Sequence, residues 1–259
     1  MIIDVNAYVG SYPFRSLSNR TAAGMVAQMD RWGIQQALVS SLPAVLYRDT
    51  QRGNEELMDE ILPHRARLIP MATVNPKYAG WERDMDEAVA RWKVKAVTLV
   101  PEHHGYALSD AVGQAALTRI TRAGLPVVLT QRFEDRRQRH AWDRAEDLSL
   151  DSVLDAARAH SQLKFALINW VGLDGPKLAA AGLKGRCLID FARLAVLVRR
   201  EVPKLIEALG VKAIAFGSHA PFDYVGPSLV KLENLATLGA SDHEKIAWRN
   251  AAMFFGLAL

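Results

Sequence analysis

Polar side chains that could bind a small molecule stand at the ends of several short apolar runs. In the first run, Asn6 and Tyr8 are two residues apart, so in a strand both side chains leave the same face. Asn169 stands at the end of a later run. Amide and phenol groups orient a substrate or stabilise an oxyanion through hydrogen bonds. The three residues are therefore candidate substrate-binding groups.

A histidine near the end of the chain is the best candidate for acid–base chemistry. Ala215, Gly217 and His219 alternate, so His219 faces the interior of a barrel if the other two do. An imidazole takes up and returns a proton near neutral pH. The structural alternative is a histidine satisfied by hydrogen bonds to neighbours such as Asn6 or Asn169.

A second catalytic candidate is His104, one of two adjacent histidines in the loop from Pro101 to Tyr106. Adjacent loop side chains point in different directions, so at most one of this pair is expected to face a pocket. A solvated or hydrogen-bonded loop histidine is the alternative reading for His104.

Two arginines could bind a carboxylate, because a guanidinium forms paired hydrogen bonds to it. Arg15 follows the first apolar run, and Arg132 follows Gln131 directly after the fifth. Gln131 is a further candidate for orienting a substrate. The segment 131–140 is the most charged in the chain, and it could equally be a solvated loop with internal ion pairs. The sequence leaves open whether this loop faces the pocket.

Short apolar runs alternate with amphipathic segments along the whole chain. The expected strands are Ile2–Tyr8, Ala37–Ser41, Leu68–Val74, Ala96–Val100, Pro126–Thr130, Lys164–Asn169, Arg186–Phe191 and Ala213–Ser218. The expected helices are Thr21–Trp32, Asn54–Leu62, Trp81–Trp92, Ser109–Ala123, Asp151–His160, Gly175–Ala181, Val202–Leu209 and Ser241–Phe255. Ser109 is a plausible helix cap, and Ser241 with Glu244 matches a capping box.

This alternation predicts an α/β protein with a single (β/α)₈ TIM barrel as one domain over residues 1–259. A doubly wound open sheet is the main alternative, but no Gly-x-Gly-x-x-Gly follows the first strand. In a barrel of this type the active site lies at the carboxyl ends of the strands, where the candidate residues stand.

Composition narrows the function classes. The chain has 259 residues, 50% hydrophobic and 23% charged, with 32 basic against 28 acidic side chains. No basic tail or long apolar run stands out, so we expect a cytoplasmic protein that binds neither nucleic acid nor membrane. The single Cys187 lies in an apolar run and is expected to be a small buried hydrophobe.

Several stretches together resemble the amidohydrolase-related (amidohydrolase 2) family of metal-dependent TIM-barrel hydrolases. They are residues 2–8 (IIDVNAY), 97–110 (VTLVPEHHGYALSD) followed by 124–126 (GLP), 216–222 (FGSHAPF) and 250–256 (NAAMFFG). They occur in the family's order and span nearly the whole chain. The resemblance implies a TIM barrel whose site lies at the strand ends.

The chain departs from that family at the positions that the resemblance assigns to metal ligands. Where the family has histidines after strands 1, 5 and 6 and an aspartate after strand 8, this chain has Asn6, Tyr8, Gln131, Asn169 and His219. Neutral amide oxygens are poor ligands for Zn²⁺. We therefore expect a divergent member with no metal and no other cofactor.

The leading hypothesis is a metal-independent enzyme that acts on a small, anionic organic substrate, such as a carboxylate. It would hydrolyse an ester, lactone or amide, or act as a related decarboxylase or hydratase, with His219 as acid and base. The alternatives are a non-catalytic binding protein and a metalloenzyme with a relocated site at His104, Glu134 and His219. The sequence sets neither the substrate nor the oligomeric state, and a homo-oligomer is compatible with it.

Overall fold

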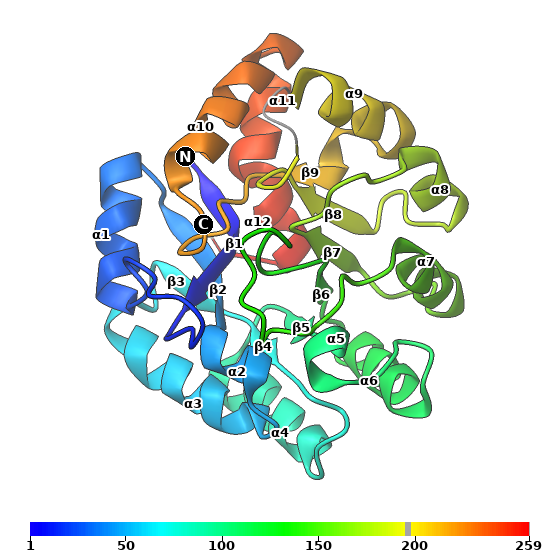
Figure 1. The fold of residues 1–259 in the computed structure, drawn as a ribbon. Coiled ribbons are helices and arrows are strands. Elements are labelled where there is room, and N and C mark those ends of the chain that lie inside the picture. Colours follow the sequence, from blue (N-terminus) through cyan, green and yellow to red (C-terminus); the bar gives the residue numbers. More distant parts are fainter. Residues whose placement is uncertain (195–197, 259) are drawn as a thin grey trace.

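The strands form a parallel barrel with helices around it (Figure 1). The computed structural model describes residues 1–194 and 198–258. Within these ranges the strands are β1 (Ile3–Val9), β2 (Gln36–Ser41), β3 (Leu68–Pro70), β4 (Ala72–Thr73), β5 (Val97–Leu99), β6 (Val127–Thr130), β7 (Phe165–Ile168), β8 (Cys187–Asp190) and β9 (Ile214–Ala215). The expected third strand is β3 and β4 together. All eight expected strands are present, and the predicted TIM-barrel fold class is confirmed.

The strands follow one another in sequence order around the barrel. One sheet has the order β1-β2-β3 and the other runs from β4 to β9, with every pairing parallel. The break falls after Pro70, which has no backbone N–H to donate. Met71 still donates to the Val39 carbonyl, and Val5 donates to Phe216. These bonds link β4 to β2 and the last strand to the first.

The helices begin and end close to the expected positions in most cases. They are α1 (Ala22–Trp32), α2 (Leu42–Leu46), α3 (Thr50–Ile61), α4 (Trp81–Glu87), α5 (Pro101–His104), α6 (Ala111–Arg122), α7 (Leu150–Ala159), α8 (Gly175–Ala180), α9 (Val198–Leu209), α10 (Val225–Asn234), α11 (Ala240–Glu244) and α12 (Asn250–Phe255). Single π-helical turns, Ala88–Trp92 and Lys245–Arg249, extend α4 and join α11 to α12. Short 3₁₀ turns cover Leu62–His64, Val211–Ala213 and Leu235–Leu238.

Two helix caps differ from the expectation. Ser109 precedes the N-cap position of α6, which Asp110 occupies, and Ser241 lies inside α11, which begins after Gly239. The helix predicted from Asn54 begins four residues earlier, where the side chain of Asp49 accepts from the Gln51 amide. The capping predictions at Ser109 and Ser241 are therefore wrong, because Asp110 and Gly239 occupy the N-cap positions of these helices. The sequence reading also missed α2, α5 and α10.

Side chains from alternate positions divide the core into two layers. Val5, Leu38, Val128 and Ala215 belong to the cluster inside the barrel, whereas a larger cluster packs between the strands and the helices. Cys187 is buried, as expected. No helix of residues 1–194 and 198–258 is long and apolar enough to cross a membrane.

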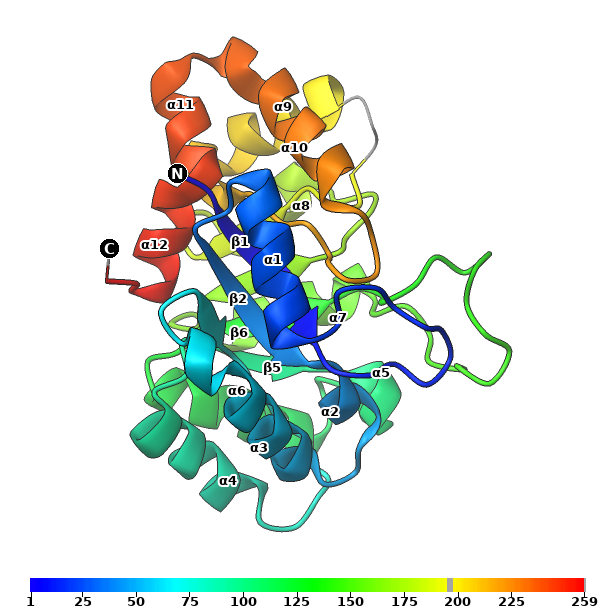
Figure 2. The same cartoon turned by 90° about the vertical axis from the view of Figure 1, so that its left-hand side faces the viewer.

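Two long loops extend from the carboxyl end of the barrel, on the side away from the two chain ends (Figure 2). The loop after β1 contacts the loop after β6 through Arg15–Glu134, through Tyr12–Asp143 and through stacking of Phe14 on His140. These loops form the outer rim of the barrel mouth.

Candidate active site

Three side chains at the ends of different strands form a buried polar cluster beneath the mouth. The Nδ2 of Asn6 on β1 donates to Asn169 Oδ1 at 2.7 Å and to Asp190 Oδ2 at 3.1 Å. The Asp190 oxygens also accept from the backbone amides of Asn169 and Ala192. Burial raises the Asp190 pKa, although these hydrogen bonds oppose the shift. The cluster joins β1, β7 and β8 at the level where a barrel enzyme binds its substrate.

Gly217 allows this close approach. A Cβ at this position would lie 2.6 Å from Asp190 Oδ2 and 3.0 Å from the Cβ of Asn6. Any larger residue would therefore push the cluster apart.

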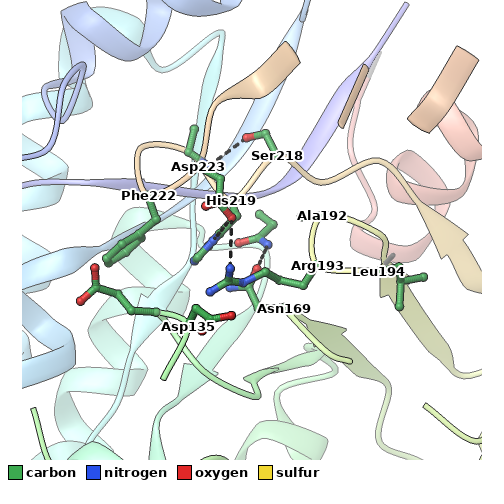
Figure 3. A network of polar contacts seen from close by, with 12 residues as sticks. Asp135, Asn169, Ala192, Arg193, Leu194, Ser218, His219, Phe222 and Asp223 are labelled. Carbon is green, nitrogen blue, oxygen red and sulfur yellow. Dashed lines mark hydrogen bonds and ion pairs between the residues drawn. The ribbon is translucent and has the colours of Figure 1, made fainter. Parts of the chain in front are cut away.

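His219 lies beside this cluster with one ring nitrogen fixed and the other without a partner (Figure 3). Its Nδ1 is 2.9 Å from Asp223 Oδ2, and its backbone N–H donates to the Asn6 carbonyl. The side chain is fully buried, and burial lowers its pKa although Asp223 opposes the shift. An Asp223 carboxylate selects the tautomer with the proton on Nδ1, which leaves a lone pair on Nε2. Such an imidazole can act as a base.

The backbone is also unusual at these positions. His219 and Asn169 have φ angles of 60° and 58°, in the left-handed region that non-glycine residues rarely adopt. Outliers of this kind concentrate at functional sites, where surrounding contacts hold them in place.

Aromatic rings surround the histidine. Phe222 stacks on the His219 ring with centroids 5.0 Å apart, and Tyr8 meets it edge-on at 6.0 Å. The Tyr8 hydroxyl lies 3.3 Å from Thr130 Oγ1, and burial raises its pKa. Tyr8 thus remains a neutral phenol that can donate a hydrogen bond.

Asp223 and Arg193 are site residues that the sequence reading missed. In Figure 3 the Arg193 guanidinium lies between His219 and Asp135, and its Nη1 is 3.8 Å from Asp223 Oδ2. Burial opposes ionisation of Asp223, but the hydrogen bond with His219 and the charge of Arg193 outweigh it and lower the pKa. Arg193 stands just after the seventh expected strand. Arg15 and Arg132 are candidates because they follow expected strands, and the same signal points to Arg193.

Asp190 also carried a signal in the sequence. It is an aspartate inside an otherwise apolar run, Cys187–Phe191, and buried carboxylates need hydrogen-bond partners. The sequence does not identify those partners, because Asn6 lies 184 residues away from Asp190 along the chain.

The structure brings Asn6, Tyr8, Asn169 and His219 together, places Arg15 on the rim, and places the other candidates away from this cluster. Gln131 accepts a hydrogen bond from the Val171 amide at 2.9 Å, and Arg132 pairs with Asp147 at 3.1 Å. Gln131 thus joins the loop after β6 to the segment after β7, and Arg132 stabilises the loop after β6 itself.

His104 lies on α5, and its Nε2 is 3.2 Å from the Ala44 carbonyl. Burial lowers its pKa to about 4, so it remains neutral and ties α5 to α2. Its neighbour His103 faces the mouth rim instead, 3.4 Å from Asp143, which also accepts from the Tyr12 hydroxyl.

Arg15 lies on the rim, as a carboxylate-binding residue would, but it already has partners. Its Nη2 donates to the Phe222 carbonyl at 3.0 Å and its Nε lies 3.3 Å from Glu134 Oε1. Burial raises the Glu134 pKa, although the Arg15 charge opposes the shift. This pair closes the rim above the aromatic rings.

Several solved structures share this fold along almost the whole chain. A 5-carboxyvanillate decarboxylase from Sphingomonas paucimobilis superposes with a TM-score of 0.73 at 15% identity, covering 99% of both chains. A probable 2-pyrone-4,6-dicarboxylic acid hydrolase from Acinetobacter baumannii, with citric acid bound, gives 0.70 at 13% identity and 99% of both chains. A dihydroxybenzoic acid decarboxylase from Polaromonas, with manganese and an inhibitor bound, gives 0.69 at 16% identity, covering 99% of this chain and 97% of that one.

At these identities the similarity concerns the fold. The expected resemblance to amidohydrolase-related barrels is confirmed at that level. No protein-family model and no curated protein matches the sequence.

The manganese in the last of these structures raises the question of whether this mouth fits a metal ion. Both Asp190 oxygens accept hydrogen bonds from neighbouring N–H groups, and the unpartnered Asn169 Nδ2 is a donor that would repel a cation. In the described part of the chain, no group of three or more His, Cys, Asp or Glu side chains is arranged to hold a metal. The relocated site at His104, Glu134 and His219 is thus not formed here. The described side chains around the Asn6–Asn169–Asp190 cluster are therefore not arranged to bind a divalent cation.

Proposed function

We propose that this protein is an acid–base enzyme that transforms a small anionic organic molecule, by hydrolysis or by a related lyase reaction, without a metal centre. The observation that carries the proposal is the state of His219. Its Nδ1 is oriented by Asp223 and its Nε2 is buried without a hydrogen-bond partner. A catalytic base has this arrangement, in which a third group orients the ring and the second nitrogen is free for the substrate.

The neighbouring groups have matching chemistry. Asn6 Oδ1 is an unpartnered acceptor and Asn169 Nδ2 an unpartnered donor, and both side chains are fully buried. An organic ligand with hydroxyl and carbonyl groups would satisfy both, and the Tyr8 hydroxyl could donate to an oxyanion. The Arg193 guanidinium, beside Asp223, is the group that would bind a substrate carboxylate.

In a hydrolysis, His219 Nε2 would take a proton from the attacking water and return it to the leaving oxygen or nitrogen. In a decarboxylation, the same nitrogen would first take a proton from a substrate hydroxyl or a water molecule, and would then pass it to the carbon from which CO₂ leaves. The proteins of similar fold are named as decarboxylases of aromatic carboxylates and as a hydrolase of a pyrone dicarboxylate. Their names support testing this protein for both hydrolysis and decarboxylation.

The test is a screen of lactones, esters and aromatic carboxylic acids, with and without a chelator and with added Mn²⁺. We expect turnover that survives chelation, gains nothing from Mn²⁺ and is lost in His219→Asn. Activity that requires the metal would contradict the metal-free proposal. Loss in Arg132→Ala but not in His219→Asn would contradict the assignment of the base.

A non-catalytic binding protein is the second candidate. The packing of Phe222 and Tyr8 against His219 favours it, because the buried rings restrict access to Nε2. Tight binding of a carboxylate that is never consumed would support this alternative.

A further inference from the structure

A buried lysine lies behind the candidate site. Lys231 belongs to α10, and only 6% of the residue is exposed. Its Nζ donates to the carbonyl oxygens of Phe191, Ala192 and Leu194 at 3.3, 2.6 and 2.9 Å. An ammonium group has three N–H donors, so these bonds use all of them. Lys231 is thus a clamp on main chain and not a free nucleophile.

The three carbonyls flank Arg193 in the turn that follows β8 (Figure 3). The same turn contains the Ala192 amide, which donates to Asp190. Buried carbonyls need donors, and an irregular turn supplies few of its own. In the structure the Arg193 side chain extends from this turn towards Asp223 and His219.

Charge couples the lysine to the same residues. Burial lowers the Lys231 pKa, while Asp190 and Asp223 oppose the shift. Asp190, Asp223 and Arg193 also act on the pKa of His219, with the arginine lowering it and the two carboxylates raising it. A displacement of Arg193 away from His219 is therefore expected to raise the pKa of His219.

We infer that Lys231 is a positioning residue that holds the turn after β8 and thereby aims Arg193 at the His219–Asp223 pair. The inference rests on the proposed function in assigning Arg193 as the carboxylate anchor. Its structural part does not depend on finding a substrate.

The experiment follows the His219 ring protons by NMR across pH. His219→Asn identifies the signal among the seven histidines. In Lys231→Met we expect the His219 titration midpoint to rise, because Arg193 no longer stays beside the imidazole. The matched control is Lys95→Met. It removes a lysine–carbonyl bond to Gly256 near the amino end of β5 and should leave the midpoint unchanged.

A double variant separates positioning from the direct loss of a charge. If Lys231 acts through Arg193, the effect of Lys231→Met should shrink in an Arg193→Gln background. Equal effects in both backgrounds, or a lower melting temperature with no change in midpoint, would overturn the inference. Lys231→Gln keeps two N–H donors and should give an intermediate midpoint. It carries the test if the methionine variant does not fold.

Once a substrate is known, Lys231→Met should raise KM roughly tenfold, and Arg193→Gln should do the same. The kcat of Lys231→Met should change less than about threefold. An absence of turnover in every form would contradict the proposed function, while the NMR result would still decide the role of Lys231.

Discussion

The loop after β6 and the floor of the barrel mouth use charge in opposite ways. In the loop, Asp147 pairs with Arg132, Arg136 and Arg139, while Arg137 pairs with Asp135. On the floor, few groups are charged, but a base and two amide atoms are buried without partners. The dense charges neutralise one another, whereas an unpartnered buried polar group costs about 1–3 kcal/mol. The high charge density of the segment 131–140 therefore marks a loop whose charges pair with one another, whereas the groups available to a ligand belong to the sparse buried set.

We expect the largest loss of activity from His219→Asn. Asparagine tolerates a positive φ, so the fold should survive with a nearly unchanged melting temperature. Without the base, turnover should fall by about 10²–10⁴-fold. Wild-type kcat/KM should decline on acidification only below the usual histidine range, because burial lowers the pKa of His219 and the neutral ring is the active form. Surviving turnover with a lower melting temperature would make His219 a structural residue.

The buried set should also affect stability through Asp4. This carboxyl is buried beneath the mouth and accepts from the Asn6 and Ser218 amides, and burial raises its pKa to about 7. The folded protein then holds a proton that the unfolded chain releases near pH 4, so this group lowers stability as pH rises from 4 to 7.

Asp4→Asn removes that titration and keeps an oxygen to accept both amides. Its unfolding free energy, relative to wild type, should therefore rise with pH by up to about 1.4 kcal/mol per pH unit. Urea titrations at several pH values measure this, with Asp59→Asn on the exposed face of α3 as the control. A difference that stays constant with pH would show that Asp4 is ionised in the folded protein.

Arginines from the two regions give a direct contrast in ligand binding. Arg193→Gln should weaken binding of a carboxylate ligand roughly tenfold, because about 1.4 kcal/mol corresponds to one decade. Calorimetry with the best ligand from the screen measures this. An unchanged dissociation constant would remove Arg193 from the site.

The smallest effect is expected for Arg132→Ala. The sequence marks Arg132 as a candidate carboxylate-binding residue, but its pairing with Asp147 predicts a change of less than about twofold. The same calorimetry serves as the measurement. A tenfold loss would show that the loop turns its arginines towards the ligand and would erase the contrast between the two regions.

The barrel, and the residues that share a face within one strand, could be predicted from the sequence alone. Alternation along a strand has a period of two, so the placement of Tyr8 with Asn6 on β1 follows from local geometry. His219 lies four residues beyond β9 with a positive φ, so its place beside the cluster depends on the turn and not on alternation. The helix Val225–Asn234 was missed because its capping position, Tyr224, has no side-chain cap bond and its start carries no capping signal.

The contacts between site residues that are far apart in sequence depend on the tertiary structure. Asp223 lies in a loop, and its contact with His219 depends on the conformation of the turn between them. Asn6 and Asp190 come from strands far apart in sequence, and Lys231 reaches the turn after β8 from another helix. The directions of His104, Gln131 and Arg132 depend on which backbone groups lie nearby, at Ala44, Val171 and Asp147. Long-range packing sets these contacts, and local residue patterns therefore do not predict them.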